Sequence, residues 1–146
     1  MMSAGELTAN VGGRRFEFGA FRFSTVNFDS ATASQVSGSN GNDTLTITPA
    51  LIRLYSTDYT FNITGAQNMS ADDFNEGTDQ LILNDTAGDD QLVVDSNGLT
   101  MNGDQFEFQS TEFPTMRAVG RGGGTNTATV TDPPAGFQLF GQWDQD

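Results

Sequence analysis

The stretch GTDQLILNDTAGDDQL, residues 77–92, contains the pattern from which a fold can be predicted. Leu81 and Leu83 stand at alternate positions, and Leu92 and Val94 do the same after a run of Asn, Asp, Thr, Ala and Gly. An apolar residue at every second position is what a strand with one buried face requires. Asn, Asp and Gly are common turn formers. The stretch therefore predicts two short strands joined by a turn.

The same features return 47 positions further along the chain. At that shift, apolar residues fall on apolar residues, and Gly, Thr and Asp fall on their like. The aligned pairs include Ile52 with Leu99, Leu54 with Met101, Tyr59 with Phe106, Phe61 with Phe108, Gly77-Thr78 with Gly124-Thr125, and Leu83 with Val130. A less regular first copy precedes them. We therefore predict one domain, residues 1–146, made of about three units at 5–49, 50–96 and 97–143.

Two all-β architectures satisfy this pattern. In a parallel β-solenoid, or β-helix, the units stack so that equivalent residues such as Tyr59 and Phe106 lie over one another in a column. In an antiparallel β-sandwich the same strands pair through hairpins. A constant spacing favours the solenoid, which is the predicted fold, and the sandwich is the alternative. One helical turn is expected within Asn68–Phe74, because Ser70 can cap it and two Asp residues follow.

The charge of the chain narrows the choice of function. Nineteen acidic residues stand against six basic ones, all of them Arg, and the net charge is −13. Such a chain repels phosphate backbones and anionic headgroups, so neither nucleic-acid binding nor membrane insertion is expected. His and Cys are absent, which removes the usual general base, thiol nucleophiles and most zinc ligands. Adjacent carboxylates such as Asp89 and Asp90 would point to opposite faces of a strand. We therefore predict no catalytic residues and no enzyme.

The segment GSNGNDTLT, residues 38–46, matches the calcium-binding nonapeptide G-G-x-G-x-D-x-U-x except at Ser39. Glycines allow the tight turn, and carbonyls with a carboxylate supply the hard oxygen ligands that calcium prefers. At these residues the sequence resembles the haemolysin-type (RTX) calcium-binding repeats. Residues 77–92 are also similar to the tandem repeats of giant secreted bacterial surface proteins, which read roughly G-T-D-T-A-x-L-x-D-S-A-G-D-D-x-F. This resemblance implies an extracellular β-rich array without a catalytic role.

Calcium is therefore the one candidate cofactor, although the chain departs from the RTX pattern. The matching steps lie 11 or 47 residues apart instead of following one another, and Ala135 and Phe137 stand where the first copy has Gly41 and Asp43. Asp and Gly can also serve simply as turn formers, so the absence of any cofactor is the other reading. The candidate calcium ligands are Asn42, Asp43, Asp79, Asp85, Asp89 and Asp90.

These observations favour a structural or adhesive module of an extracellular or cell-surface assembly. We expect such a module to associate with copies of itself end to end into a filament, because an uncapped solenoid exposes strand edges. Phe140 and Trp143 are the residues expected at that contact. The rival hypothesis is a module that binds calcium or surface glycans. Met1–Thr8 has neither the basic nor the apolar region of a signal peptide, so an extracellular location requires a leader that this chain lacks.

Overall fold

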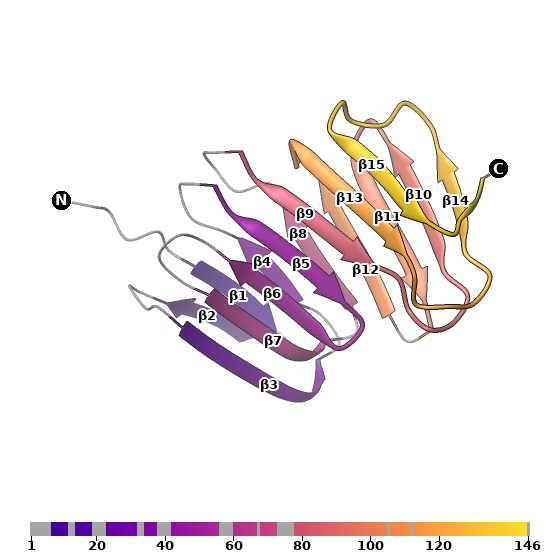
Figure 1. Cartoon of the computed structure of the whole chain (residues 1–146). Helices are drawn as coiled ribbons and strands as arrows, with labels where there is room; N and C mark the ends of the chain where they lie inside the picture. The colour runs from indigo at the N-terminus through magenta and orange to yellow at the C-terminus, as the bar shows by residue number, and fades with distance from the viewer. Residues whose placement is uncertain are drawn as a thin grey trace.

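The prediction of an all-β fold is confirmed by the computed structural model, in which every regular element of the described residues is a strand (Figure 1). It describes residues 7–11, 14–18, 23–31, 34–37, 42–55, 60–66, 68–72, 78–104, 106–111 and 113–145. The strands are β1 (Leu7–Val11), β2 (Arg14–Phe18), β3 (Phe23–Ala31), β4 (Ser34–Ser37), β5 (Thr44–Thr48), β6 (Leu51–Tyr55), β7 (Thr60–Ala66), β8 (Asn68–Asp72), β9 (Gln80–Asn84), β10 (Gln91–Asp95), β11 (Gly98–Gly103), β12 (Phe106–Thr111), β13 (Thr115–Gly120), β14 (Thr127–Val130), β15 (Phe137–Gly141) and β16 (Asp144–Gln145).

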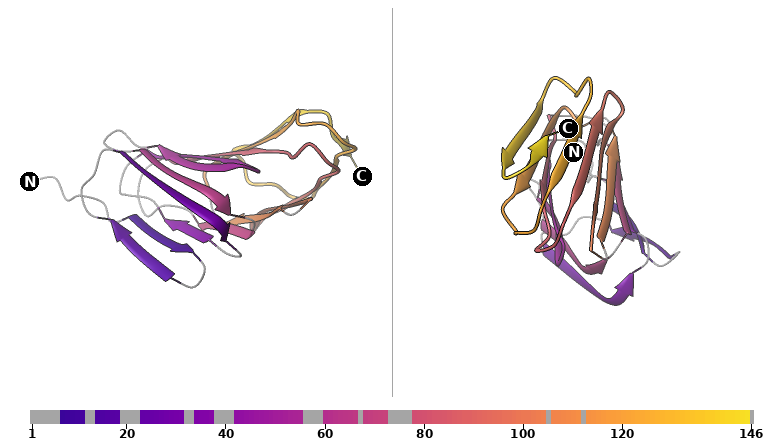
Figure 2. Two further views of the ribbon diagram at one scale, coloured as in Figure 1. Left: turned by 90° about the horizontal axis from the view of Figure 1, so that it is seen from below. Right: turned by 90° about the vertical axis from the view of Figure 1, so that its right-hand side faces the viewer.

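These strands form two sheets that lie face to face, as the side and end views show (Figure 2). The nine-stranded sheet has the order β16-β14-β10-β11-β12-β8-β4-β1-β2. The seven-stranded sheet has the order β15-β13-β9-β5-β6-β7-β3. Both sheets contain parallel and antiparallel neighbours, for example β5 with β9 and β5 with β6. The sheets are therefore mixed, and neither a wholly parallel nor a wholly antiparallel arrangement is correct.

The chain passes repeatedly from one sheet to the other. From β7 onward β8, β9 and β10 alternate between the sheets, and so do β12 to β16. Two three-stranded meanders interrupt this alternation: β5–β6–β7 lies within the seven-stranded sheet, and β10–β11–β12 lies within the nine-stranded sheet. Crossings bring strands far apart in sequence into parallel contact, whereas the antiparallel pairs come from the two meanders and from β1, which pairs with β2 and β4.

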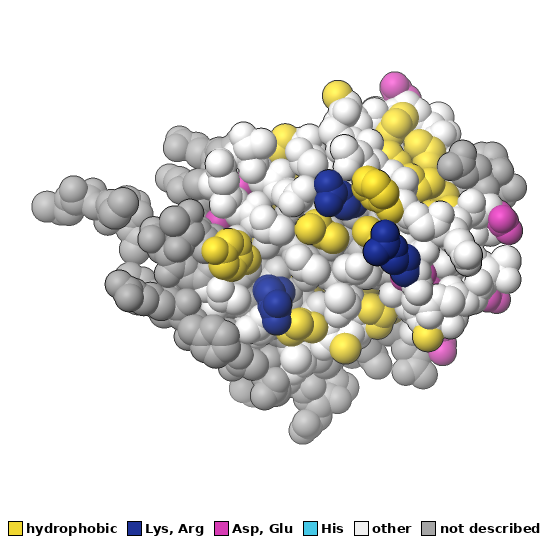
Figure 3. All heavy atoms as spheres, viewed as in Figure 1, with side chains coloured by type: hydrophobic (Ala, Val, Ile, Leu, Met, Phe, Trp, Pro, Cys, Tyr) yellow, Lys and Arg dark blue, Asp and Glu magenta, His cyan; other side chains and the backbone are white. Residues whose placement is uncertain are grey.

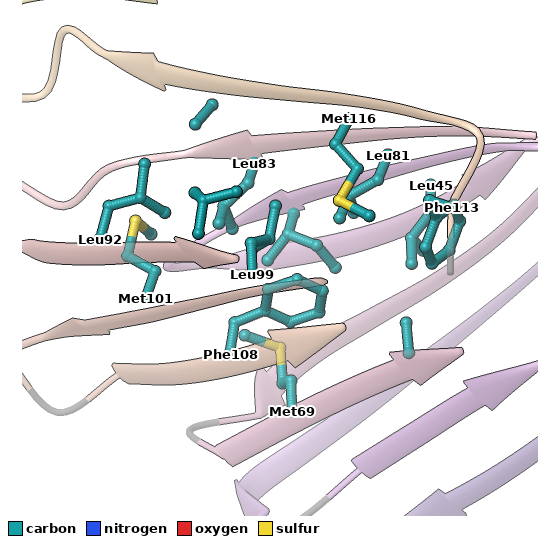
Figure 4. Packing of buried hydrophobic residues seen from close by; sticks show 14 of the residues in the cluster. Leu45, Met69, Leu81, Leu83, Leu92, Leu99, Met101, Phe108, Phe113 and Met116 are labelled. Atoms are coloured by element: carbon teal, nitrogen blue, oxygen red, sulfur yellow. The ribbon is translucent and has the colours of Figure 1, made fainter. Parts of the chain in front are cut away.

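The core lies between the two sheets. In β5, β9 and β10 every second residue is buried, as the alternation of the sequence predicts. Phe108 of β12 is fully buried and stands beside Met69 of β8, its partner in the strand register. Leucine and methionine side chains from both sheets surround this pair (Figure 4). Full burial of one such side chain contributes roughly 1.5–3 kcal/mol, so this alternation is the main reason that the sheets stay together.

The predicted columns of residues 47 positions apart are wrong. Phe61 lies in β7 of the seven-stranded sheet and Phe108 in β12 of the nine-stranded sheet, while Tyr59 lies outside the described residues. Parallel neighbours are instead separated by a shorter step, as in Leu45 opposite Leu81 and Leu92 opposite Ala128. The reason is the number of crossings. Between β5 and β10 the chain crosses from one sheet to the other three times. Because this number is odd, β10 lies in the opposite sheet from β5.

The predicted helical turn is also wrong over its described part. Residues Asn68–Asp72 form β8, which pairs in parallel with β4 on one side and with β12 on the other. Met69 and Ala71 of this strand are buried in the core. Burial of these alternate residues and pairing on both edges outweigh the local preference of Ser70 for a helix cap.

Candidate functional site

The first candidate site is a pair of turns where β5 and β9 begin. Asn42 and Asp43 immediately precede β5, and Thr78 and Asp79 immediately precede β9. Because these strands are parallel neighbours, the two segments lie side by side. The N–H of Thr78 donates to Oδ1 of Asn42 (2.8 Å), and the N–H of Asp43 donates to Oδ1 of Asp79 (2.8 Å). The N–H of Gln80 donates to the carbonyl of Asp43 (2.9 Å). We call residues 42–43 with 78–79 the first strand-entry turn.

The same arrangement occurs in the other sheet, where β10 and β14 begin. The N–H of Thr125 donates to Oδ1 of Asp89 (2.7 Å), and the N–H of Asp90 donates to Oδ1 of Asn126 (3.1 Å). The N–H of Thr127 donates to the carbonyl of Asp90 (2.9 Å). Every donor and acceptor stands 47 positions after its counterpart. We call residues 89–90 with 125–126 the second strand-entry turn.

Asp and Asn exchange places between the two turns. The acceptor for the Thr N–H is Asn42 in the first turn and Asp89 in the second. The acceptor for the buried Asp N–H is Asp79 in the first and Asn126 in the second. An amide oxygen and a carboxylate oxygen both accept from an N–H. The turns therefore need a carbonyl-type oxygen at each place, and they do not need its charge.

The second turn is joined to a further carboxylate, Asp85, at the end of β9. Both oxygens of Asp85 accept from the N–H of Gly122, at 2.7 and 2.8 Å. The side-chain amide of Asn126 donates to Oδ2 of Asp85 (2.9 Å). The N–H and the hydroxyl of Thr86 donate to Oδ2 of Asp90, at 2.9 and 3.0 Å. Two carboxylates and one amide are thus held in a single hydrogen-bonded network.

Asp90 is the least well satisfied carboxylate in this network. Only 2% of its surface is exposed, and its Oδ1 is buried without a hydrogen-bond partner among the described residues. That oxygen faces Gly103, where an added Cβ would come within 2.1 Å of it. Burial raises the pKa of Asp90 and the charges of Asp85 and Asp89 raise it further, while the hydrogen bonds from Thr86 oppose the rise. Burial therefore destabilises the ionised form of Asp90 relative to the protonated form.

The structure divides the predicted calcium ligands between two places. Asn42, Asp43 and Asp79 belong to the first turn, whereas Asp85, Asp89 and Asp90 lie around the second. Asp79 and Asp85 flank opposite ends of β9, and six residues of extended chain span about 20 Å. Within the ranges that the structure describes, no three acidic side chains form a cluster suited to a metal ion. Calcium binding stays a prediction.

Two residues of the network, Thr86 and Asn126, were not predicted from the sequence. The signal for Asn126 was present, because the alignment of Gly77-Thr78 with Gly124-Thr125 continues to Asp79 on Asn126. Nothing in the local sequence singles out Thr86.

The second candidate site is the C-terminal end, where β15 and β16 are the edge strands of the two sheets. Phe140 of β15 is 40% exposed, and the guanidinium of Arg117 lies over its ring at 5.1 Å. The indole N–H of Trp143 donates to the carbonyl of Phe140 (2.9 Å), and the indole packs on Gly120, where an added Cβ would come within 2.6 Å of it. The two residues expected at a self-association contact therefore lie together, with Phe140 exposed and Trp143 partly buried.

No protein-family model, curated protein or solved structure matches this chain. Among the described residues there is no helix that could cross a membrane.

Proposed function

We propose that this protein is a non-catalytic structural module that associates end to end with further copies of itself. In this proposal the module is a β-solenoid whose coils are interrupted by the two meanders, in an extracellular or cell-surface assembly. The support for the setting is the resemblance of residues 77–92 to repeats of secreted surface proteins. The support for end-to-end association is the direction of the edge strands.

The edge strands of each sheet run in the same direction. In the seven-stranded sheet the only antiparallel pairs are β5 with β6 and β6 with β7. The first pair reverses the strand direction and the second restores it, so β3 and β15 are parallel. In the nine-stranded sheet four antiparallel steps cancel in the same way, so β2 and β16 are parallel. A second copy stacked head to tail would thus continue both sheets at once through parallel pairing. Head-to-tail contacts that do not close into a ring produce filaments.

The C-terminal end also carries apolar surface that a neighbouring copy would cover. Val130, Phe137, Leu139 and Trp143 pack against the core but are only partly buried. Phe137 stands 47 positions after Asp90, so this end lacks the carboxylate of the two strand-entry turns. The contact would therefore depend on main-chain hydrogen bonds and apolar burial. The net charge of −13 opposes association, and salt should weaken that opposition.

Sedimentation velocity of the full chain over a range of concentrations, at low and high salt, tests the proposal. We expect large species whose fraction grows with protein concentration and with salt, and filaments by electron microscopy. Phe140→Lys places a charge beside the edge and should abolish them, because lysines on edge strands disfavour pairing. Tyr55→Lys, on the 57% exposed Tyr55 in the interior of the same sheet, is the matched control and should still associate.

A strict monomer at all concentrations and salts contradicts the proposal, as does equal association of the two variants. Far-ultraviolet circular dichroism confirms that both variants remain folded. The same runs in calcium and in chelator examine the calcium prediction. If calcium alone produces the large species, a metal-dependent contact replaces the main-chain contact proposed above.

A further inference from the structure

The outer face of the seven-stranded sheet differs in charge from the rest of the molecule. Six of its seven strands, β5, β6, β7, β9, β13 and β15, contain no Asp or Glu, and only the edge strand β3 contains one, Asp29, although the chain carries nineteen acidic residues. The same strands contain Arg53 in β6 and Arg117 in β13. On this face arginine side chains, in dark blue, stand among uncoloured and hydrophobic groups, and the carboxylates lie mostly toward the margin (Figure 3).

The two arginines lie in one row across the sheet. The strand register places the following residues side by side: Gln138, Arg117, Ile82, Thr46, Arg53 and Asn62. Three strand spacings separate Arg117 from Arg53, which is about 14 Å. The row therefore consists of polar side chains and one isoleucine, with an arginine near each end.

Neutral neighbours hold both guanidinium groups. Arg117 donates to Oε1 of Gln138 at 3.2 Å and lies over the ring of Phe140. Arg53 donates through Nε to Oδ1 of Asn62 at 3.1 Å. No carboxylate of the described residues pairs with either arginine. Their side chains are thus positioned while their charges remain uncompensated, and a guanidinium is well suited to bind a carboxylate or a sulfate.

Two exposed aromatic residues accompany the row. Tyr55 at the end of β6 is 57% exposed, and Phe140 on β15 is 40% exposed. The C–H face of a sugar ring packs on an aromatic ring, and hydroxyl groups of a sugar can bond to polar side chains such as those of Thr46 and Gln138 in the row. An open sheet surface suits an extended chain, whereas a small molecule prefers a concave pocket.

We propose that this face binds an acidic polysaccharide, with Arg53 and Arg117 pairing with carboxylate or sulfate groups and Tyr55 and Phe140 stacking on sugar rings. Charge complementarity selects the occupant. Two cations about 14 Å apart can pair with two separate acidic groups along one extended glycan. Duplex DNA carries one charge per about 1.7 Å, so the acidic remainder of the chain would repel it more strongly than it would repel a glycan with fewer charges per unit length. This binding does not depend on end-to-end association.

Titration of the full chain with polygalacturonate, chondroitin sulfate, dextran and poly(U), at low and moderate salt, tests the proposal. We expect binding to one or both acidic glycans and none to neutral dextran. The double variant Arg53→Gln/Arg117→Gln should bind at least about tenfold more weakly. Tyr55→Ala should weaken binding without changing its salt dependence. The carboxylated and sulfated glycans show which acidic group is preferred.

A control separates the local contacts from the total charge. Adding Asp95→Asn and Glu107→Gln to the double variant removes two exposed carboxylates from the other sheet and restores the net charge of −13. We expect no recovery of binding, whereas these two changes alone should leave binding intact. Failure of the parent to bind either acidic glycan overturns the proposal, and so does undiminished binding by the double variant. Equal binding of poly(U) would indicate unspecific attraction of polyanions and would also contradict it.

Discussion

The first and second strand-entry turns make the same three hydrogen bonds with different side chains. In the first, Asn42 and Asp79 are the side-chain acceptors, and in the second they are Asp89 and Asn126. Since both residue types succeed in both roles, the bonds depend on an oxygen at the right place. The comparison shows that the carboxylates of Asp79 and Asp89 act as backbone caps at the start of parallel strands, which is a structural role.

The turns differ in what surrounds the buried Asp. Asp90 in the second turn shares its network with Asp85 and Thr86, and its Oδ1 has no partner within the described part of the chain. The burial that raises its pKa makes the second turn sensitive to pH. Substitutions at Asn126, Asp90 and Asp89 should therefore affect the stability of the protein to different degrees.

Asn126→Ala should have the largest effect. It leaves the buried N–H of Asp90 without an acceptor and removes a donor from Asp85. Each such loss costs about 1–3 kcal/mol, so we expect the free energy of unfolding to fall by about 2–3 kcal/mol in urea titrations. Thr129→Ala, at an exposed position of β14, the strand that follows Asn126, is the control and should change the free energy of unfolding by less than about 0.5 kcal/mol. Equal losses would show that the turn is not held by these bonds.

Asp90→Asn should change the pH dependence of stability. The pKa of Asp90 is raised in the folded state above the usual 3.8, so the folded state binds this proton more tightly than the unfolded state. The parent therefore loses this contribution as the pH rises from below the usual pKa through the raised one. In the variant that loss is absent. We expect the stability of the variant relative to the parent to increase between pH 3 and pH 7, measured by urea unfolding at both pH values. If the difference in the free energy of unfolding is the same at both, the pKa of Asp90 is not raised in the folded state.

Asp89→Asn and Asn42→Asp should have the smallest effect. Each change introduces the residue that the other turn already uses for the same bond to a Thr N–H, and both positions are exposed. We expect shifts of less than about 0.5 kcal/mol in either direction, by the same urea titrations. A loss above about 1 kcal/mol from Asp89→Asn alone would mean that its charge has a role of its own, and a bound cation would then be the first explanation to examine.

Strands and turns could be predicted from the sequence more reliably than the candidate functional sites. Alternation in 77–92 correctly predicted β9, β10 and the turn between them, because burial of every second residue leaves a direct mark on the sequence. The helical turn predicted around Ser70 is wrong because a capping residue is a local signal, whereas β8 is stabilised by pairing with a strand on each edge. The candidate calcium ligands were chosen by residue type, which does not distinguish a metal ligand from an acceptor for a backbone N–H.

By itself the sequence determined that the chain is built of short strands, where the turns fall and that similar segments recur at a step of 47. Only the tertiary structure decided which sheet each strand joins. An apolar residue at every second position is equally compatible with a parallel or an antiparallel neighbour and with either of two facing sheets. That choice depends on how many times the chain crosses the core, and three crossings within one step place Leu45 and Leu92 in opposite sheets.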